Sequence, residues 1–419
     1  LLLRIQKRKC FTAGFLLCVV LLLWLSGHIW NIHIDGNVKN STPQLLEFLD
    51  QQGITHGIRK NQVNCTRIAD LLRKNGVEVI YYEEETAKAL STQRIRQDFA
   101  DRMIELSFIE SEGMKEAISR FLMSLSPEEM VEKIISGVRR ADLGEVRTGS
   151  LSDLTSHDYP FVMDPMPNLY FTRDPGACIG NGINIHHMHT PARRRESLLL
   201  RFMFEYDKDF AADKDGQFYD IYDDYSMEGG DVLVLSEKMV AVGYSERTTI
   251  AGIENFACNL LSRSGFKKVI VFDIPKCRAF MHLDTVFTMV DYDKFTIHPE
   301  IEGPLSVYEL TMGKGGKLKF EALTDDLGKL LARELDLPAV DLIRCGGGDR
   351  IAAQREQWND GSNTLCIEPG TVVTYERNYV TNQLLERHGV NVLTIPSAEL
   401  SRGRGGPRCM SCPVNRQDM

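Results

Sequence analysis

Residues 228–275 read EGGDVLVLSEKMVAVGYSERTTIAGIENFACNLLSRSGFKKVIVFDIP, and this stretch decides the fold. Apolar residues alternate on both sides of a short polar turn within Val232–Val242, which predicts a β-hairpin. A helical pattern follows from Ile253, Gly265 is placed to end it in the left-handed conformation, and the Val/Ile run up to Ile274 predicts a buried strand. The stretch therefore predicts a unit of hairpin, helix and strand.

The same unit recurs along the chain. Helix-then-strand patterns, each broken by Gly or Pro, are predicted at Ile68–Tyr82 (Gly76), Leu327–Ile343 (Pro338) and Asn382–Ile395 (Gly389). Further hairpins are predicted at Ala177–Ile185, Val286–His298 and Thr364–Tyr375. Strands that arrive as hairpins argue against a doubly wound parallel sheet, and they favour an α/β fold of small blades repeated around an axis.

A helical segment interrupts this pattern. Helical periodicity runs from Thr86 to Glu145, with Ser126 as an N-cap, Pro127 in the first turn and Glu129 completing a capping box. We therefore expect a helical insertion, assigned to residues 86–150. It would pack on the blades of a catalytic domain that spans residues 36–419.

The first residues of the chain have a different character. Basic residues within Arg4–Lys9 precede Cys10–Ile34, which contains no Asp, Glu, Lys or Arg and is long enough to span a bilayer. Because the chain begins at Leu1, we expect residues 1–35 to be either a membrane anchor or a start that does not represent the natural protein. A membrane is an expected partner only if the apolar segment 10–34 is genuine.

The composition bears on partners and compartment. The 419 residues include 58 acidic and 49 basic side chains, a formal net charge of -9, so the chain lacks the basic field that attracts nucleic acid. Its cysteines occur singly apart from Cys409 and Cys412, without the density of a disulfide scaffold. A reducing, cytoplasmic location is therefore expected.

Four motifs lie where chemistry is expected. NLYFTRDP (168–175), EGGD (228–231) and HLDT (282–285) each precede a predicted hairpin, and SRGRGGPRCMSCP (401–413) follows the last predicted strand. Equivalent ends of repeated units converge on one axis, so residues that are distant in sequence are expected to face a common cavity.

The pair Cys409 and Cys412 forms a CxxC motif that has three interpretations. It can be redox-active or half of a zinc site, it can be an inert pair, or one cysteine can be a nucleophile. The Gly-rich approach contains Arg402, Arg404 and Arg408, which are expected to favour the thiolate over the thiol. This favours a nucleophile, Cys409.

His282 and four carboxylates complete the candidate chemistry. If the segment is extended, Asp284 points to the same face as His282, and a histidine held protonated beside carboxylates can act as a general acid and base. Paired carboxylates recognise a planar guanidinium in bidentate geometry. Each of these residues could instead serve the fold alone, and the carboxylates, Asp174, Glu228, Asp231 and Asp284, could bind Mg²⁺ or Ca²⁺. No metal role is expected for the cluster His186, His187 and His189.

The strings NLYFTRDPGACIGNGINIHHMHTPARRRES, MEGGDVLVLSEKMVAVGYSERT, MHLDTVFTMVD and SRGRGGPRCMSCP, in this order, resemble the arginine deiminase family. The resemblance covers roughly residue 38 to the end of the chain. It implies the five-bladed α/β propeller of the guanidine-modifying (pentein) superfamily, built from ββαβ-type units, with a helical insertion. It also implies hydrolysis of L-arginine to L-citrulline and ammonia through an S-alkylthiouronium on the cysteine, with no metal and no other cofactor.

The resemblance also implies roles for individual residues. Cys409 matches the family's nucleophile, His282 its general acid/base and Glu228 the carboxylate that supports the histidine, while Asp174 and Asp284 match the pair that binds the guanidinium. The residues expected around the rest of the substrate are Asn168, Phe171, Arg193, Asp231, Arg247, Gly403 and Arg404. Two departures stand out: Arg408 replaces a histidine found before the nucleophile in many members, and residues 1–37 do not resemble the family's first strand.

The sequence is also compatible with other functions. A related amidinotransferase or dimethylarginine hydrolase would share the cysteine and histidine, although the three arginines and the helical segment favour a deiminase. The sequence also leaves room for a metal-binding module and for an inactive, membrane-anchored arginine-binding homologue. The expected partner is the small molecule L-arginine, and a homo-oligomer is compatible with the sequence.

Overall fold

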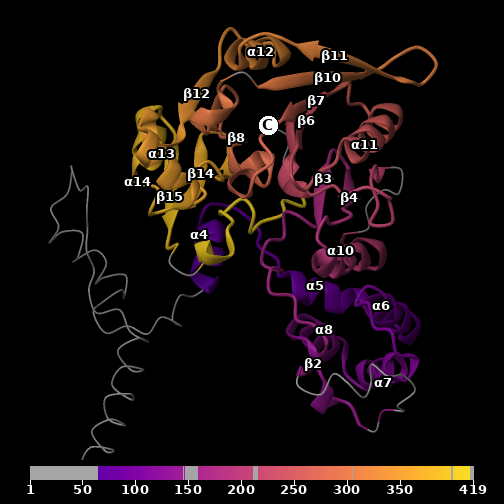
Figure 1. Ribbon diagram of the computed structural model, residues 1–419. Helices are drawn as coiled ribbons and strands as arrows, with labels where there is room; N and C mark the ends of the chain where they lie inside the picture. Colours follow the sequence, from indigo (N-terminus) through magenta and orange to yellow (C-terminus); the bar gives the residue numbers. More distant parts are fainter. Residues whose placement is uncertain are drawn as a thin grey trace, which may run out of the picture. The chain divides into compact units, whose positions relative to one another are not determined.

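The computed structural model describes residues 65–144, 146, 159–210, 216–303, 305–397 and 400–415 (Figure 1). The apolar segment predicted within residues 1–35 lies outside the described residues. Within the ranges given, no helix has both the length and the apolar character needed to cross a membrane. The chain forms two compact units, residues 1–79 and 80–419.

In the first unit, the described part contains helix α4 (Cys65–Lys74). Gly76 follows with a φ of 80°, and the amide of Val77 donates to the carbonyl of Leu72, so glycine ends the helix as predicted. The strand predicted after Gly76 is wrong, because residues 77–81 form no strand.

The second unit opens with four helices, α5 (Tyr82–Ala89), α6 (Gln93–Glu105), α7 (Glu112–Met123) and α8 (Pro127–Ser136). The capping box of α8 is confirmed, since the amide of Glu129 donates to Ser126 Oγ (3.2 Å) and the amide of Ser126 donates to Glu129 Oε2 (2.9 Å). Helix α10 (Arg194–Tyr206) packs against α5, and Phe99 meets Phe202 edge-on in the core that the helices share with it. A short ladder of β1 (Val138–Arg139) and β2 (Phe161–Met163) follows α8.

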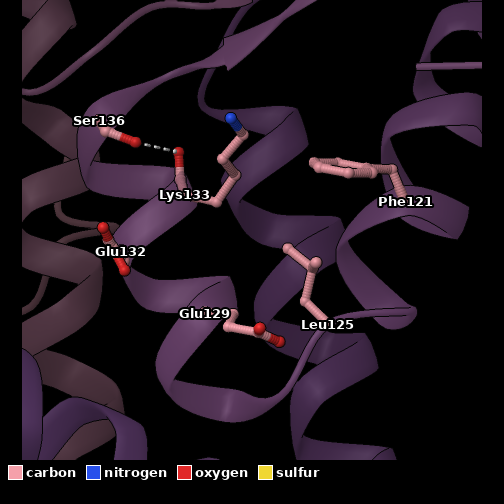
Figure 2. A pocket seen from close by; sticks show the side chains of 6 residues that line it. All are labelled: Phe121, Leu125, Glu129, Glu132, Lys133 and Ser136. Atoms are coloured by element: carbon pink, nitrogen blue, oxygen red, sulfur yellow. Dashed lines mark hydrogen bonds between the residues drawn. The ribbon is translucent and has the colours of Figure 1, made fainter. Parts of the chain in front are cut away.

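A cavity of about 310 Å³ opens on helices α7 and α8 (Figure 2). Its lining includes Glu129, which accepts the capping hydrogen bond, and Lys133, which pairs with Asp142. Phe121 and Leu125 supply its apolar wall. None of the candidate catalytic residues lines it, so the chemistry must be sought elsewhere.

The unit predicted from residues 228–275 is confirmed. Strands β5 (Val232–Ser236) and β6 (Met239–Tyr244) form an antiparallel hairpin, helix α11 (Ile250–Arg263) follows, and β7 (Lys268–Asp273) returns parallel to β6. One detail is wrong: Gly265 does not take a positive φ, and the helix ends at Ser264 in an extended conformation.

A hairpin that was not predicted widens this sheet. Strands β10 (Ser306–Met312) and β11 (Leu318–Leu323) add to β7, which gives the order β11-β10-β7-β6-β5. They form a long hairpin at the edge of the sheet (Figure 1).

Two further units have the same order. Strands β8 (Phe287–Met289) and β9 (Lys294–Ile297) precede α12 (Leu327–Glu334), and β12 (Asp341–Arg344) returns parallel to β9. Strands β13 (Leu365–Glu368) and β14 (Thr371–Tyr375) precede α14 (Tyr379–Arg387), and β15 (Asn391–Ile395) returns parallel to β14. Helix α13 (Arg350–Gln357) lies between them in sequence, and the hairpin of β3 (Gly176–Ile179) and β4 (Gly182–Ile185) precedes α10.

The described strands form separate sheets of two, five, three, three and two strands, and none of these sheets is closed. The mixed α/β class is confirmed; the five-bladed propeller is not established by these sheets. The turns that enter the hairpins do meet. The amide of Gly229 donates to the carbonyl of Asp174, the amide of Leu283 donates to Asp231 Oδ1, and the amide of Arg173 donates to the carbonyl of Cys409.

Candidate active site

Cys409 lies in the loop after the short helix η10 (Leu400–Gly403), and its side chain is buried. Its amide donates to Asn363 Oδ1 at 3.1 Å, and its Sγ lies 3.7 Å from Asp284 Oδ2. Because the backbone of Cys409 is held on both its amide and its carbonyl, the thiol has a defined position against the carboxylate of Asp284.

The electrostatic surroundings of this thiol contradict one expectation. Burial raises the pKa of Cys409 well above its ordinary value, the carboxylates of Asp284, Asp174 and Asp360 raise it further, and Arg408 only partly opposes them. Arg408 thus acts in the predicted direction, but the prediction that the neighbouring arginines make the thiolate the favoured form of Cys409 is wrong. The acidic groups prevail, and Cys409 is a neutral thiol until something offsets their charge.

His282 is buried between two carboxylates. Its Nε2 lies 2.8 Å from Glu228 Oε2, and its Nδ1 lies 3.8 Å from Asp174 Oδ1. Burial alone would lower the pKa of His282, but Asp174, the hydrogen bond to Glu228 and the charge of Asp231 raise it to about 10. Burial opposes ionisation of Glu228 as well, yet the contact with His282 lowers the pKa of Glu228 to about 2. Both shifts favour an imidazolium–carboxylate pair.

Backbone turns fix this pair in place. The amide of His189 donates to Glu228 Oε1 at 3.0 Å, and the amide of Glu228 donates to Thr248 Oγ1 at 3.1 Å. A Cβ at Gly230 would lie only 2.7 Å from the ring of His282. Glycine is therefore needed at this point of the EGGD turn for the imidazole to approach.

Both carboxylate oxygens of Asp231 accept hydrogen bonds from the protein. Ser245 Oγ donates to Oδ2 at 2.6 Å, and the amide of Leu283 donates to Oδ1 at 2.8 Å. Burial raises the pKa of Asp231 to about 7. Its contacts hold the HLDT turn against the EGGD turn, which suits a positioning role better than direct contact with a substrate.

Asp284 does not share a face with His282 as predicted. The segment Leu283–Thr285 is a 3₁₀ turn rather than an extended strand, so the two side chains take different partners. Asp284 is fully buried, forms an ion pair with Arg408 and lies beside Cys409. His282 faces Glu228 instead. The turn thus delivers one group toward the thiol and another toward the buried carboxylates.

The three candidate arginines differ in their contacts. Arg193 is paired on Nη1 with Asp174 (2.8 Å) and on Nη2 with Glu196 (2.8 Å). Arg247 Nη1 donates to Thr190 Oγ1 at 2.6 Å. Arg404 donates from Nη2 to the carbonyl of Arg278 at 3.4 Å, and its remaining nitrogens have no hydrogen-bond partner among the described residues.

Asn168, Phe171 and Gly403 lie in loops. Phe171 is buried and lies against the loop that carries Cys409, since a Cβ at Gly403 would come within 3.0 Å of its ring. Asn168 is half-buried, and its carbonyl accepts the amide of Phe171 at 3.0 Å. These contacts place the loop of residues 168–171 next to the loop that carries Cys409.

The structure therefore brings together five predicted residues from four motifs: Asp174, Glu228, His282, Asp284 and Cys409. Asp174, Glu228 and His282 are also the one set of metal-ligand side chains clustered in the described part of the chain. Because the pKa of His282 is about 10, a metal ion would have to displace its proton. Cys412 lies outside this set, with its Sγ 3.8 Å from the carbonyl of Gly176 and no disulfide to Cys409.

Sequence reasoning missed Asn363. Its side chain is fully buried, and it joins two catalytic segments by accepting the amide of Cys409 and donating from Nδ2 to the carbonyl of Asp284 at 3.2 Å. The string NDGSN (359–363) directly precedes the hairpin of β13 and β14, the same position that drew attention to the other motifs. Applying that positional rule to the last hairpin would have identified it. Sequence reasoning also missed Asp360, which raises the pKa of Cys409, and Glu196, which pairs with Arg193.

Comparison with known proteins assigns the chain to a family. The family model described as arginine deiminase matches residues 58–416. The chain belongs to the arginine deiminase family. It is 47% identical to the arginine deiminase of Bacillus thuringiensis subsp. konkukian over 386 residues, which cover 91% of this chain and 94% of that protein. It is also 47% identical to the arginine deiminase of Clostridium perfringens, over 93% of this chain and 95% of that protein.

Other matches are weaker or shorter. The family model of the stage IV sporulation protein YqfD matches residues 1–84, which overlap the arginine deiminase match from residue 58 onward. Among solved structures, apo ArgZ, an arginine dihydrolase from cyanobacteria, is 17% identical with a TM-score of 0.42, covering 60% of this chain and 33% of that one. A dimethylarginine dimethylaminohydrolase adduct is 17% identical with a TM-score of 0.40, covering 59% and 78%. At this identity and TM-score, these two structures support no inference about this chain.

The electrostatics of this arginine deiminase family member lead to a prediction for the thiol. Asp284→Asn removes the carboxylate nearest Cys409 and releases Arg408, so the pKa of Cys409 should fall. A fall of one pKa unit raises the thiolate fraction about tenfold, and iodoacetamide labelling of Cys409 at pH 8, followed by peptide mass spectrometry, should accelerate by at least about that factor.

The control for this prediction is Asp341→Asn, which removes a partly exposed carboxylate that pairs with His388. This variant should label at the wild-type rate. An Asp284→Asn protein that labels no faster than wild type would contradict the assigned cause of the raised pKa.

Proposed function

We propose that this protein is an arginine deiminase that hydrolyses L-arginine to L-citrulline and ammonia as a step of arginine catabolism by the arginine deiminase pathway. The observation that carries the proposal is a buried thiol beside one carboxylate, with the imidazole of His282 between two others, in a chain 47% identical to arginine deiminases over nine-tenths of its length. Carboxylates suit the cationic guanidinium, the thiol supplies the nucleophile, and the imidazolium supplies the acid.

Asp174 and Asp284 bind the substrate guanidinium in this proposal. Their geometry supports it, since each already accepts an arginine guanidinium from the protein, Arg193 for Asp174 and Arg408 for Asp284. A bound substrate cation also explains how the thiol becomes reactive. Its positive charge offsets the carboxylates that raise the pKa of Cys409, so thiolate forms when substrate is present.

The reaction then proceeds in two stages. The Cys409 thiolate adds to the guanidinium carbon, and the tetrahedral adduct loses ammonia as His282 gives its proton to the leaving nitrogen. An S-alkylthiouronium remains on Cys409. Water gives one proton to the neutral His282, and its oxygen adds to the thiouronium carbon. The C–S bond then breaks, the remaining hydroxyl proton passes to the leaving sulfur, and citrulline and the Cys409 thiol are released. None of these steps requires a metal or an organic cofactor.

The other end of the substrate needs cationic groups for its α-carboxylate. We assign this role to Arg193, Arg247 and Arg404, with Asn168, Phe171 and Gly403 lining the substrate between the two ends. Unsatisfied donors support the assignment of Arg247 and Arg404, because Arg247 Nε and Arg404 Nε and Nη1 are buried without a partner among the described residues. Arg193 is paired with Asp174 and Glu196, so it would have to exchange one of these carboxylates for that of the substrate. Asp231 supports the site from behind, through Leu283 and Ser245.

We also propose that the catalytic domain, residues 36–419, is a five-bladed propeller with residues 86–150 as its helical insertion. Three units with the order hairpin, helix and parallel strand support this arrangement. A cytoplasmic site of action fits the scarcity of paired cysteines in the sequence. Assembly as a homo-oligomer is compatible with the proposal.

The direct test is a colorimetric citrulline assay on the full chain with L-arginine and no added metal. Wild type should turn over, and Cys409→Ala should lose at least about a thousandfold in kcat, as expected when a covalent nucleophile is removed. Cys412→Ala is the matched control, since it removes the other thiol of the CxxC motif and should keep near-wild-type activity. Equal losses in both variants would favour the redox or metal interpretation, and turnover of other guanidines in preference to arginine would favour a related hydrolase.

The pH profile tests the role of His282. The proton that it donates is present below its pKa of about 10 and is lost as the pH rises through that value. Glu228→Gln removes the carboxylate that accepts its hydrogen bond, so the pKa of His282 should fall and the alkaline limb of the kcat/KM profile should move to lower pH by at least about one unit. Measurement of kcat/KM between pH 5 and 11 decides this, and an unmoved limb would show that His282 is not the acid.

A further inference from the structure

Arg404 occupies an unusual position for a surface-loop arginine. Its φ is 65°, a left-handed conformation that non-glycine residues rarely adopt. Its guanidinium carbon lies 3.9 Å from the centroid of the Trp358 ring, and Nη2 donates to the carbonyl of Arg278. Nε and Nη1 are buried, and the described residues offer them no acceptor. Two nitrogens of one guanidinium are thus left without an acceptor in the described part of the chain.

Trp358 has no evident task in the core. It ends helix α13, its backbone amide donates to the carbonyl of Gln354, and its side chain is 54% exposed. More than half of this side chain is exposed, and its ring is in contact with the Arg404 guanidinium. Stacking holds a guanidinium by its face, and the N–H groups stay in the guanidinium plane, where they can reach an anion.

Charged groups near Arg404 show why stacking on Trp358 would matter for its orientation. Asp360, buried two residues after Trp358, attracts Arg404, while Arg278 repels it. No hydrogen bond joins Arg404 to Asp360. A flexible arginine without the stack could turn its donors toward Asp360 or solvent, and the left-handed backbone would then have no compensation.

We propose that Trp358 is a positioning residue that sets the preference for substrates with an α-carboxylate, by holding Arg404 with two N–H donors directed to that carboxylate. The inference rests on the proposed function, in which Arg404 binds the carboxylate end of arginine. It adds a residue outside the substrate contacts that determines how well the enzyme separates arginine from uncharged analogues.

The test compares two ligands with the same guanidinium, L-arginine and L-argininamide, which replaces the carboxylate by a neutral amide. Dissociation constants are measured by calorimetry on Cys409→Ala, which prevents turnover, with and without Trp358→Ala. The Trp358→Ala substitution removes the cation–π contact between Trp358 and Arg404, which is partly exposed. Its loss should weaken L-arginine binding about 5- to 30-fold. Binding of L-argininamide should change by less than about twofold, because it lacks the charge that Arg404 binds. Trp358→Phe should recover part of the loss.

The matched control is Tyr379→Ala. Tyr379 is 38% exposed and lies 4.7 Å from the guanidinium carbon of Arg355, so it forms a similar stacked pair away from Arg404. This variant should bind both ligands as the parent does. Equal weakening of both ligands by Trp358→Ala, or no weakening of either, would overturn the inference.

Turnover of L-arginine by the protein with native Cys409 separates this inference from the proposed function. Wild type should produce citrulline, and Trp358→Ala should raise KM while kcat stays within about twofold, the pattern of lost ground-state binding. A wild type that binds L-arginine without producing citrulline would contradict the deiminase proposal and leave the ligand comparison intact. A fall in kcat with KM unchanged would contradict the positioning role.

Discussion

The imidazolium of His282, buried between Glu228 and Asp174, is the interaction on which the rest of the site depends. A charge removed from water is tolerated only when it is paired and hydrogen-bonded, and two carboxylates provide this for His282. One of these two carboxylates, Asp174, also raises the pKa of the Cys409 thiol, together with Asp284 and Asp360. The site therefore combines several acidic groups with a thiol whose pKa is raised, a combination that suits the cationic substrate of the proposed reaction.

The fold serves this arrangement by bringing short turns together. Gly230 allows the ring of His282 to approach, Asp231 ties the HLDT turn to the EGGD turn, and Asn363 ties the backbone of Asp284 to that of Cys409. All of these contacts join the turns that precede hairpins to one another or to the loop that carries Cys409. The strands give rigidity, while polar side chains and amides in the turns set the distances.

The sequence was informative where structure is local. The hairpin, helix and strand of residues 232–273 were predictable because alternation and helical periodicity are read within one window, and the Ser126 capping box was predictable because it spans four residues. The β10–β11 hairpin was not predicted, although the sequence between its strands is rich in glycine. The strand predicted after Gly76 does not form.

The candidate site divides in the same way. The motifs identified Cys409, His282 and the carboxylates, but the state of the thiol depends on which charges lie nearest in space. Arg408 lowers the pKa of Cys409 as expected, but it is paired with Asp284, and burial and the charges of Asp284, Asp174 and Asp360 outweigh it. Contacts between segments more than a hundred residues apart, such as that of Arg408 with Asp284, cannot be read from either segment alone.

The central claim is that Cys409 forms a covalent bond to the substrate, and the most direct measurement is acid quenching of the enzyme during turnover of L-arginine, followed by mass spectrometry of its peptides. We expect an adduct with the mass of arginine less ammonia on the peptide that contains Cys409, and no such adduct in the Cys409→Ala protein. Citrulline formation with an adduct on Cys412, or with Cys409→Ala still active, would contradict it.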